Sequence, residues 1–286
     1  MTPLPIVRTV ADLRAQVSAW KRAGLRVGLV PTMGALHAGH LSLVTLVKRE
    51  HDKCVASLFV NPKQFAAHED LDRYPRDEAG DAALLQSAGC DLLFAPTVDV
   101  MYPTGFATAV TVSGVSAPLE GEMRPHFFGG VATVVAKLLL QCLPDAAAFG
   151  EKDYQQLLVI RKMVADLDIP VEILAGETVR EPDGLAMSSR NAYLTPAQRE
   201  TAGLLNVIAR DAIARIEAGG AISPALSEAK AALAAAGFSP IDYVALHDAT
   251  TLAEIRTPTL QQAARLLVAA HLGGTRLIDN FAVRSV

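Results

Sequence analysis

The sequence is poor in charge and in aromatic residues. Charged residues make up 20% of the 286 positions, aromatic residues make up 5%, and the formal net charge is −4. A protein dedicated to nucleic acid owes its affinity to clustered Lys and Arg that meet phosphates, and this composition offers no such excess. The composition therefore excludes a dedicated nucleic-acid binder and favours a protein that acts on small molecules.

Cysteine is also scarce. It occurs at Cys54, Cys90 and Cys142, each within an apolar stretch. An odd number of widely spaced cysteines offers neither a disulfide framework nor the paired spacing of a zinc site. We expect three buried thiols in a reducing compartment and hence a cytoplasmic protein.

A long hydrophobic run is missing as well. The first residues, MTPLPIVRTVADLRAQ, have neither the basic start nor the apolar core of a secretory signal. The longest apolar stretch, GVATVVAKLLLQCL, is shorter than the roughly 20 residues that cross a bilayer and contains Lys137. We therefore predict no membrane segment.

Short apolar runs alternate with stretches of helical spacing over the first part of the chain. The runs RVGLV, CVASLFV, DLLFAP and AAAFG have the length and composition of buried strands. This alternation predicts an α/β domain at residues 1–180, with a mostly parallel, Rossmann-like sheet covered by helices on both faces. Ligands bind beyond the carboxyl ends of such strands, so the polar loops PTMGALHAGH and NPKQF should converge on one site.

The pattern changes at REPDGLAMSSRN, whose composition indicates a linker or hinge loop. Beyond it, Ala-rich helical segments at Pro196–Glu217 and Pro224–Ala236 precede the strand-like runs IDYVALHD, RLLVAAHL and TRLIDNFAV. These runs predict a smaller α+β lid domain at residues 181–286. The expected fold class is α/β, with a Rossmann-like domain followed by this C-terminal α+β lid.

The loop PTMGALHAGH places two histidines three residues apart, directly behind an apolar strand. If a helix begins near Gly39, its first turn presents N–H groups and the positive end of the helix dipole, as a phosphate site requires. Gly34 would let the backbone approach a ligand closely. His37 and His40 could then donate hydrogen bonds to a phosphate that gains charge during displacement. An incidental surface pair is one alternative, and a metal site, which lacks a nearby acidic or thiol ligand, is another.

Two further segments could bind phosphate. In FGEKDYQQL, Lys152 can bring a positive charge to a phosphate, and Asp153 can cap a helix or reach a ribose hydroxyl. In GLAMSSRN, two serines and Arg190 offer hydroxyls and a bidentate cation. Taken alone, the first segment is also an ordinary helix start and the second a turn before an N-cap. Together with the histidine loop they suit a nucleoside triphosphate, since the dinucleotide-binding and P-loop fingerprints are absent.

PTMGALHAGH, FVNPKQF, GEKDYQQL and MSSRN, in this order and at these intervals, resemble the pantoate-β-alanine ligase family. The resemblance extends to YPRD, MYP and DYVALHDATTL, and so covers nearly the whole chain. It implies ATP-dependent ligation of (R)-pantoate and β-alanine to pantothenate through a pantoyl adenylate, with release of AMP and pyrophosphate. It also implies ATP as a substrate, Mg²⁺, and a homodimer.

The resemblance also assigns residues to the site. His40, His37 and Lys152 would be catalytic. Gln64 and Gln156 would bind pantoate, and Gln64 would also lie at the β-alanine position. Asp81 is the candidate ligand for magnesium, an ion that often keeps its waters and is held mainly by the phosphates. ATP would be bound by Met33, Gly34, Ala35, Leu36, His37, Ala38, Gly39, His40, Gly150, Glu151, Lys152, Asp153, Val179, Met187, Ser188, Ser189 and Arg190.

One motif departs from the family pattern, and two other functions stay open. The chain reads RPHFFGGV, with His126 one position early and Phe127 where the family has histidine, whereas Arg124 fits and could help close the pocket. One alternative is a nucleotidyltransferase that adenylylates a phosphorylated acceptor, for which Lys63 would supply an extra cation. The other is a nucleotide-sensing module without catalysis, against which the intact histidine, lysine and serine-arginine set argues.

Overall fold

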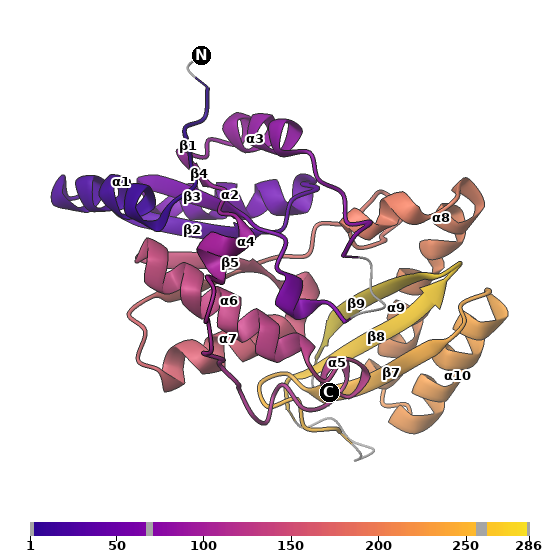
Figure 1. The fold of residues 1–286 in the computed structure, drawn as a ribbon. Coiled ribbons are helices and arrows are strands. Elements are labelled where there is room, and N and C mark those ends of the chain that lie inside the picture. Colours follow the sequence, from indigo (N-terminus) through magenta and orange to yellow (C-terminus); the bar gives the residue numbers. More distant parts are fainter. Residues whose placement is uncertain (1–2, 67–70, 256–261, 285–286) are drawn as a thin grey trace. The chain divides into compact units, whose positions relative to one another are not determined.

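The computed structural model describes residues 3–66, 71–255 and 262–284. The chain divides into two compact units (Figure 1). The first is Met1–Glu151 with Gln156–Glu177, and the second is Lys152–Gln155 with Thr178–Val286, in so far as these residues are described. The short segment Lys152–Gln155 therefore groups with the second unit although both of its neighbours in the chain belong to the first. The predicted domain ranges, 1–180 and 181–286, stay a prediction and include residues outside the described ones.

The first unit is built on a parallel sheet with the strand order β1-β4-β3-β2-β5-β6. Each neighbouring pair in this order is parallel. The predicted Rossmann-like sheet is thus confirmed, and four of its strands overlap the four apolar runs. The strands are β1 (Ile6–Val7), β2 (Val27–Thr32), β3 (Lys53–Leu58), β4 (Leu92–Phe94), β5 (Ala146–Gly150) and β6 (Glu172–Gly176).

The strand order changes direction beside β2. From β2 the chain continues to β3 and β4 on one side, whereas β5 and β6 lie on the other side. Gly28 and Leu29 of β2 pair with Ala146 and Ala147 of β5, so the two strands are direct neighbours. In open α/β sheets, ligands bind at such a switch point, at the carboxyl ends of the strands. The loops that follow β2 and β5 start from this point.

Helices cover both faces of the sheet. One apolar core joins the strands to α1 (Val10–Arg22), α6 (Phe127–Cys142) and α7 (Tyr154–Asp166), and another joins them to α2 (Ala38–Glu50) and α3 (Glu78–Ser87). Successive strand residues alternate between the two cores, as the pleat requires. Burial on both faces explains why these strands appear in the sequence as continuous apolar runs.

One glycine brings α2 close to the sheet. A Cβ on Gly28 of β2 would lie 2.3 Å from a methyl carbon of Val47 on α2, so a larger residue there would push the helix away. Short elements complete the unit, namely η1 (Pro62–Gln64), α4 (Val98–Met101) and α5 (Glu120–Met123), whereas η2 (Glu151–Asp153) begins in this unit and ends in the second.

The second unit contains a three-stranded antiparallel sheet packed with helices. The strands β7 (Ile241–Asp248), β8 (Ala264–Leu272) and β9 (Thr275–Val283) pair in that order. They share one apolar core with α8 (Pro196–Ala202), α9 (Leu204–Glu217) and α10 (Ile222–Ala235). The predicted α+β composition is confirmed.

The single helical segment predicted at Pro196–Glu217 is wrong at one point, because the chain breaks at Gly203 into α8 and α9. A Cβ on Gly203 would lie 2.6 Å from Asp183 Oδ2. The same carboxylate accepts two hydrogen bonds from Arg199 of α8, at 2.5 and 3.1 Å. Glycine has low helix propensity, and the close approach of Asp183 requires a residue without a Cβ at this point.

The segment predicted as a linker is tied into the second unit. Leu185 and Ala186 are both buried, and Leu185 belongs to the apolar core. Glu181 N–H donates to Leu185 O at 2.8 Å, and Asn191 Nδ2 donates to Ala186 O at 3.2 Å. The predicted linker or hinge loop is thus a stretch of bonded turns that leads into η3 (Ser189–Tyr193).

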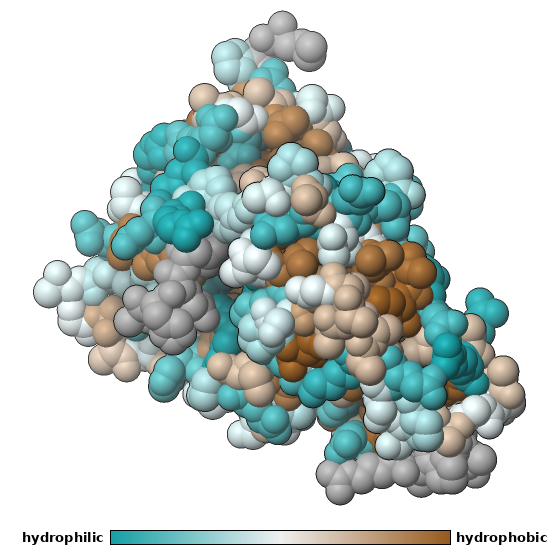
Figure 2. Space-filling model, turned by 90° about the vertical axis from the view of Figure 1, so that its right-hand side faces the viewer, coloured by the Kyte–Doolittle hydropathy of each residue, from teal (hydrophilic) through white to brown (hydrophobic). Residues whose placement is uncertain are grey.

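The three cysteines are free and buried, as predicted. Burial raises the pKa of the Cys142 thiol to about 12, which keeps it protonated at neutral pH. None of the described helices has the length and apolar character needed to cross a membrane. On the face drawn in Figure 2, apolar residues form patches between hydrophilic ones.

Candidate active site

Residues 33–37 connect β2 to α2, and the two histidines cap the helix. His37 is the N-cap residue, with extended backbone. Its Nδ1 accepts from Gly39 N–H at 3.2 Å, and His37 N–H donates to His40 Nδ1 at 3.3 Å. Each ring thus satisfies a backbone N–H group that no carbonyl of the helix can reach. The prediction that a helix begins near Gly39 is confirmed.

The caps fix the tautomer of both imidazoles. Because a backbone N–H donates to each Nδ1, that nitrogen carries no proton, and a neutral ring then carries its proton on Nε2. The two ring centroids lie 4.2 Å apart, and the ring planes are inclined by 50°. One turn of chain therefore holds two Nε2–H donors on adjacent rings, the arrangement that stabilises an oxyanion.

A buried carboxylate holds the loop ahead of the histidines. Asp81 of α3 is only 4% exposed. Its Oδ2 accepts from Ala35 N–H at 3.0 Å, and its Oδ1 accepts from Leu36 N–H at 2.8 Å. Gly34 and Ala35 both have positive φ, at 90° and 52°, which is strained backbone for alanine. The two bonds to Asp81 offset that strain and keep the loop in this conformation.

This geometry does not support the assignment of Asp81 to magnesium. Both oxygens already accept from loop amides, and a Cβ on Gly34 would lie 2.9 Å from Oδ2. Among the described residues, no group of three or more His, Cys, Asp or Glu side chains could hold a metal ion. The residues present fit a clamp on the histidine loop and do not fit a metal site of the protein.

The loop after β3 lies against the loop after β2. Gln64, in η1, donates from Nε2 to Met33 Sδ at 2.7 Å, while its Oε1 accepts from Asn61 Nδ2 at 3.1 Å. The predicted convergence of the two polar loops is thus confirmed at this contact. Because Oε1 accepts a hydrogen bond from Asn61, the Gln64 atom that faces Met33 is Nε2, which is a donor.

Asn61 is a residue that the sequence reasoning missed. It is 1% exposed, and all sides of its amide are bonded. Nδ2 donates to Gln64 Oε1 and to Gly130 O at 3.1 Å each, and Oδ1 accepts from the Tyr102 hydroxyl at 2.8 Å and from Lys63 N–H at 3.2 Å. Burial raises the pKa of Tyr102 to about 12, so this phenol stays a donor. The signal that could have identified Asn61 was its place in the motif NPKQF, directly before Pro62.

Lys63 is engaged by aromatic rings. Its Nζ lies 5.0 Å from the Tyr102 ring centroid and 5.1 Å from that of Phe106. Lys137 Nζ lies 4.8 Å from the same Phe106 ring. These cation–π contacts give Lys63 a packing role, so it is a poor choice for the cation that a phosphorylated acceptor would require.

The departure RPHFF places an aromatic ring under Arg124. The guanidinium carbon of Arg124 lies 3.9 Å from the Phe127 ring centroid, and its NH2 donates to Gln64 O at 3.2 Å. Arg124 also lies 3.8 Å from a carboxylate oxygen of Glu120. Phe127 thus stacks on the arginine that supports the Gln64 turn, and His126 precedes α6 without a side-chain cap.

The end of β5 provides further predicted residues of the first unit. Gly150 pairs with Gly176 of β6, and Glu151 starts the turn that follows. Gln156 lies in α7 and is half-buried. Its side chain makes no hydrogen bond to another residue of the described ranges, so the structure does not join it to the Gln64 network.

The predicted nucleotide residues of the second unit form two groups. Met187 N–H donates to Val179 O at 3.0 Å, which brings Val179 beside the stretch Met187–Arg190. Ser188 Oγ accepts from Arg190 N–H at 3.3 Å and caps η3, as an ordinary N-cap would. The other group is Lys152 and Asp153, whose Nζ and Oδ1 lie 3.5 Å apart.

A match to a family model and to named relatives supplements this geometry. Residues 5–282 match the family described as pantoate-beta-alanine ligase. The pantothenate synthetase of Caulobacter vibrioides is 58% identical over 99% of this chain and 100% of its own length. The pantothenate synthetase of Rhodospirillum rubrum is 56% identical over the same shares.

Solved structures agree with these matches. The pantothenate synthetase of Thermus thermophilus has a TM-score of 0.90 and 49% identity, over 97% of this chain and 99% of its own. The pantoate-beta-alanine ligase of Francisella tularensis, complexed with beta-gamma ATP and beta-alanine, has a TM-score of 0.83 and 33% identity, over 97% of both chains. The alternatives of an acceptor-phosphate nucleotidyltransferase and of a non-catalytic module are thereby set aside. Taken with the histidine caps and the Gln64 contact, these matches mean that the chain belongs to the pantoate-β-alanine ligase family.

Proposed function

We propose that this ligase joins (R)-pantoate to β-alanine through a pantoyl adenylate, with ATP as the source of the adenylyl group. The observation that carries the proposal is the histidine pair, whose two Nε2–H donors lie one turn apart at the start of α2. Together with the helix N-terminus they favour a phosphate that gains negative charge.

The first half-reaction is an attack by pantoate on the α-phosphorus of ATP. A carboxylate oxygen of pantoate forms the new P–O bond, and the bond to the bridging oxygen breaks, so that its electron pair leaves with pyrophosphate. His37 and His40 donate from Nε2 to the nonbridging oxygens as this charge develops. Gln64, with Asn61 holding its Oε1, donates from Nε2 to pantoate in place of Met33.

The second half-reaction forms the amide. The amine nitrogen of β-alanine attacks the acyl carbon, the C–O bond to the phosphate breaks, and AMP leaves while the amine loses a proton to solvent. Neutral glutamine amides suit the first half-reaction, because they hold the hydroxyl and carboxylate groups of pantoate without pairing tightly with its nucleophilic oxygen. Gln64 and Gln156 are assigned to pantoate, and Gln64 also to β-alanine.

We assign ATP to the histidine loop and the end of β5, with Lys152 and Arg190 as the cations and Ser188 and Ser189 as the hydroxyls for its phosphates. Magnesium enters as part of the ATP substrate, held by phosphate oxygens and water. The ATP set is Met33, Gly34, Ala35, Leu36, His37, Ala38, Gly39, His40, Gly150, Glu151, Lys152, Asp153, Val179, Met187, Ser188, Ser189 and Arg190.

The test is isotope exchange between pyrophosphate and ATP. If the acyl adenylate forms before the amine is needed, labelled pyrophosphate should enter ATP when pantoate is present and β-alanine is absent. Omission of pantoate should abolish the exchange, which separates adenylation from hydrolysis of ATP by water. Exchange that begins only after β-alanine is added would favour a concerted ligation. Formation of ADP and phosphate as products would contradict the adenylate intermediate.

The proposed assembly follows from the family resemblance, and the proposed location follows from the cysteine content. We infer a homodimer in the cytoplasm, where three buried free thiols are compatible with a reducing compartment. Light scattering after size-exclusion chromatography measures the mass in solution. A mass equal to one chain at micromolar concentration would contradict the dimer.

A further inference from the structure

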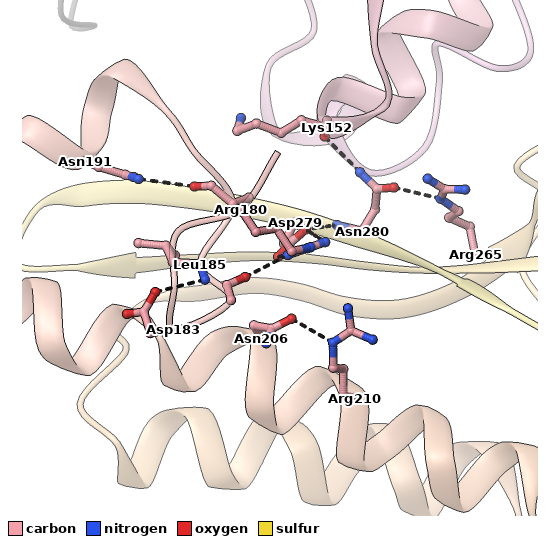
Figure 3. Close-up of polar contacts among 12 residues, drawn as sticks. Lys152, Arg180, Asp183, Leu185, Asn191, Asn206, Arg210, Arg265, Asp279 and Asn280 are labelled. Carbon is pink, nitrogen blue, oxygen red and sulfur yellow. Dashed lines mark hydrogen bonds and ion pairs between the residues drawn. The ribbon is translucent and has the colours of Figure 1, made fainter. Parts of the chain in front are cut away.

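Lys152 is held by a strand that lies 128 residues further along the chain. Asn280 of β9 is 3% exposed, and its Nδ2 donates to Lys152 O at 2.8 Å. The lysine side chain is directed away from this amide (Figure 3). The bond therefore fixes the backbone from which the side chain of Lys152 extends and leaves the ammonium group outside the contact.

The direction of the Asn280 amide is set by an arginine. Arg265 Nε donates to Asn280 Oδ1 at 2.7 Å, so Oδ1 must face the arginine and Nδ2 must face Lys152 O. The guanidinium carbon of Arg265 lies 4.0 Å from the Tyr154 ring centroid. The Tyr154 hydroxyl in turn donates to Ala249 O at 2.8 Å. The segment Lys152–Gln155 is thus bonded at two points to the rest of the second unit.

The neighbouring residue of β9 holds the other phosphate-binding segment. Asp279 accepts from Arg180 at 2.7 and 3.0 Å, and Arg180 NH1 also donates to Gly184 O at 3.0 Å. Asn280 N–H donates to Asp279 Oδ1 at 2.7 Å. Two consecutive residues of one strand therefore anchor Lys152 and the turn that leads to Met187–Arg190 (Figure 3).

We propose that Asn280 is a positioning residue for ATP binding. Its amide, aligned by Arg265, sets the place from which Lys152 meets the phosphates. This inference rests on the proposed role of Lys152. A buried amide bonded at both its oxygen and its nitrogen cannot rotate without loss of a hydrogen bond, so the backbone of Lys152 keeps one position.

Asn280→Asp is the variant that isolates this bond. Aspartate has nearly the same shape and keeps an oxygen for Arg265 Nε, but it places an acceptor against Lys152 O where a donor stood. We expect the Kd of a non-hydrolysable ATP analogue and the KM for ATP to rise by roughly 5- to 30-fold, the effect of one unmade buried hydrogen bond. The KM values for pantoate and β-alanine should be unchanged.

Asn206→Asp is the matched control. Asn206 is also buried in the second unit, and its Oδ1 accepts from Arg210 Nε at 2.9 Å, so the pair repeats the Asn280–Arg265 contact without Lys152. This variant places a carboxylate beside an arginine in the same unit and should leave the Kd of the analogue unchanged. If Asn280→Asp fails to fold, Asn280→Ser removes the same donor without a new charge.

The role of Lys152 is tested separately by Lys152→Met. If Lys152 binds phosphate, Lys152→Met alone should raise the Kd of the analogue. Adding Asn280→Asp to this variant should then raise the Kd no further. An equal effect of Asn280→Asp with and without Lys152, or an unchanged Kd in Asn280→Asp, would overturn the positioning role while the proposed function stands. An unchanged Kd in Lys152→Met would overturn the assignment of Lys152 itself and the inference with it.

Discussion

His37 caps α2 with the same imidazole that presents Nε2–H to the proposed phosphate site. The two tasks can be separated by substitution, because asparagine is a good N-cap but has no group at the position of Nε2. His37→Ala should lower the free energy of unfolding by about 1 kcal/mol and should also lose most exchange of pyrophosphate into ATP. His37→Asn should keep the stability and still lose the exchange. Normal exchange in His37→Asn would remove His37 from the adenylation step.

Asp81 gives a second test at the scale of one residue. Asp81→Asn leaves one oxygen for one loop amide and turns an NH₂ group toward the other. We expect destabilisation by about 1–3 kcal/mol, the cost of an unpaired buried group, and a higher KM for ATP as the histidine loop relaxes. The Mg²⁺ concentration for half-maximal rate, measured at saturating ATP, should stay the same. A large rise in that concentration would restore Asp81 as a metal ligand.

At the scale of elements, we expect the contact of Asp183 with Arg199 to stabilise the break between α8 and α9. The hydrogen bonds from Arg199 hold the pKa of the Asp183 carboxyl below its ordinary value of about 3.9. A carboxyl whose pKa is lower in the folded state stabilises the fold above the unfolded-state pKa, and this contribution is lost as the pH falls through the folded-state pKa. The pair is partly exposed, with side-chain exposures of 31% and 39%, so its contribution is about 0.2–1 kcal/mol.

Asp183→Asn should therefore lower the unfolding midpoint at pH 7. The difference from the original chain should hold down to about pH 4 and disappear at lower pH. Asp211→Asn removes a more exposed pair with Arg215 on α9 and should change the midpoint less. A difference for Asp183→Asn that persists below the folded-state pKa would show that shape, and not charge, fixes the break.

Strand bounds were predictable where turn residues mark both ends of an apolar run. AAAFG, IDYVALHD and TRLIDNFAV coincide with β5, β7 and β9. By contrast, β1 has two residues and too little length for any periodic signal. At Gly203 the glycine alone was a weak signal for a break, and its contact with Asp183, which lies outside α8 and α9, leaves no periodic signal within the helices.

At the scale of the whole molecule, the two substrates should protect different parts of the chain. Both proposed pantoate residues, Gln64 and Gln156, belong to the first unit, whereas the proposed ATP residues belong to both. A ligand stabilises the state that it binds. An ATP analogue at 100 times its Kd should therefore raise the free energy of any opening that destroys its binding site by about 2.7 kcal/mol. Hydrogen exchange should slow in β3 and in β9 with the analogue, but only in β3 with pantoate. Equal protection of β9 by pantoate would contradict the residue assignment.

The candidate site was predictable from sequence only where its chemistry is local. The histidine pair and the Ser188–Arg190 stretch are contiguous motifs. The residues that hold them are remote, since Asp81 reaches Leu36 across 45 positions, Tyr102 reaches Asn61 across 41, and Asn280 reaches Lys152 across 128. A single sequence carries no signal for such pairs, which explains why Asp81 was assigned to a metal and why Asn61 and Asn280 were missed.

The histidine caps also decide which compounds could block the enzyme. With both Nδ1 atoms occupied by backbone N–H groups, the imidazole pair offers an incoming molecule only N–H donors. An inhibitor with an amine or an amidine at this point would place its own N–H donors against the Nε2–H donors of the histidines. Sulfonyl, carboxylate or phosphonate oxygens would instead accept hydrogen bonds from both rings. Compound libraries for this target should therefore be selected for acceptors at the position of the α-phosphate.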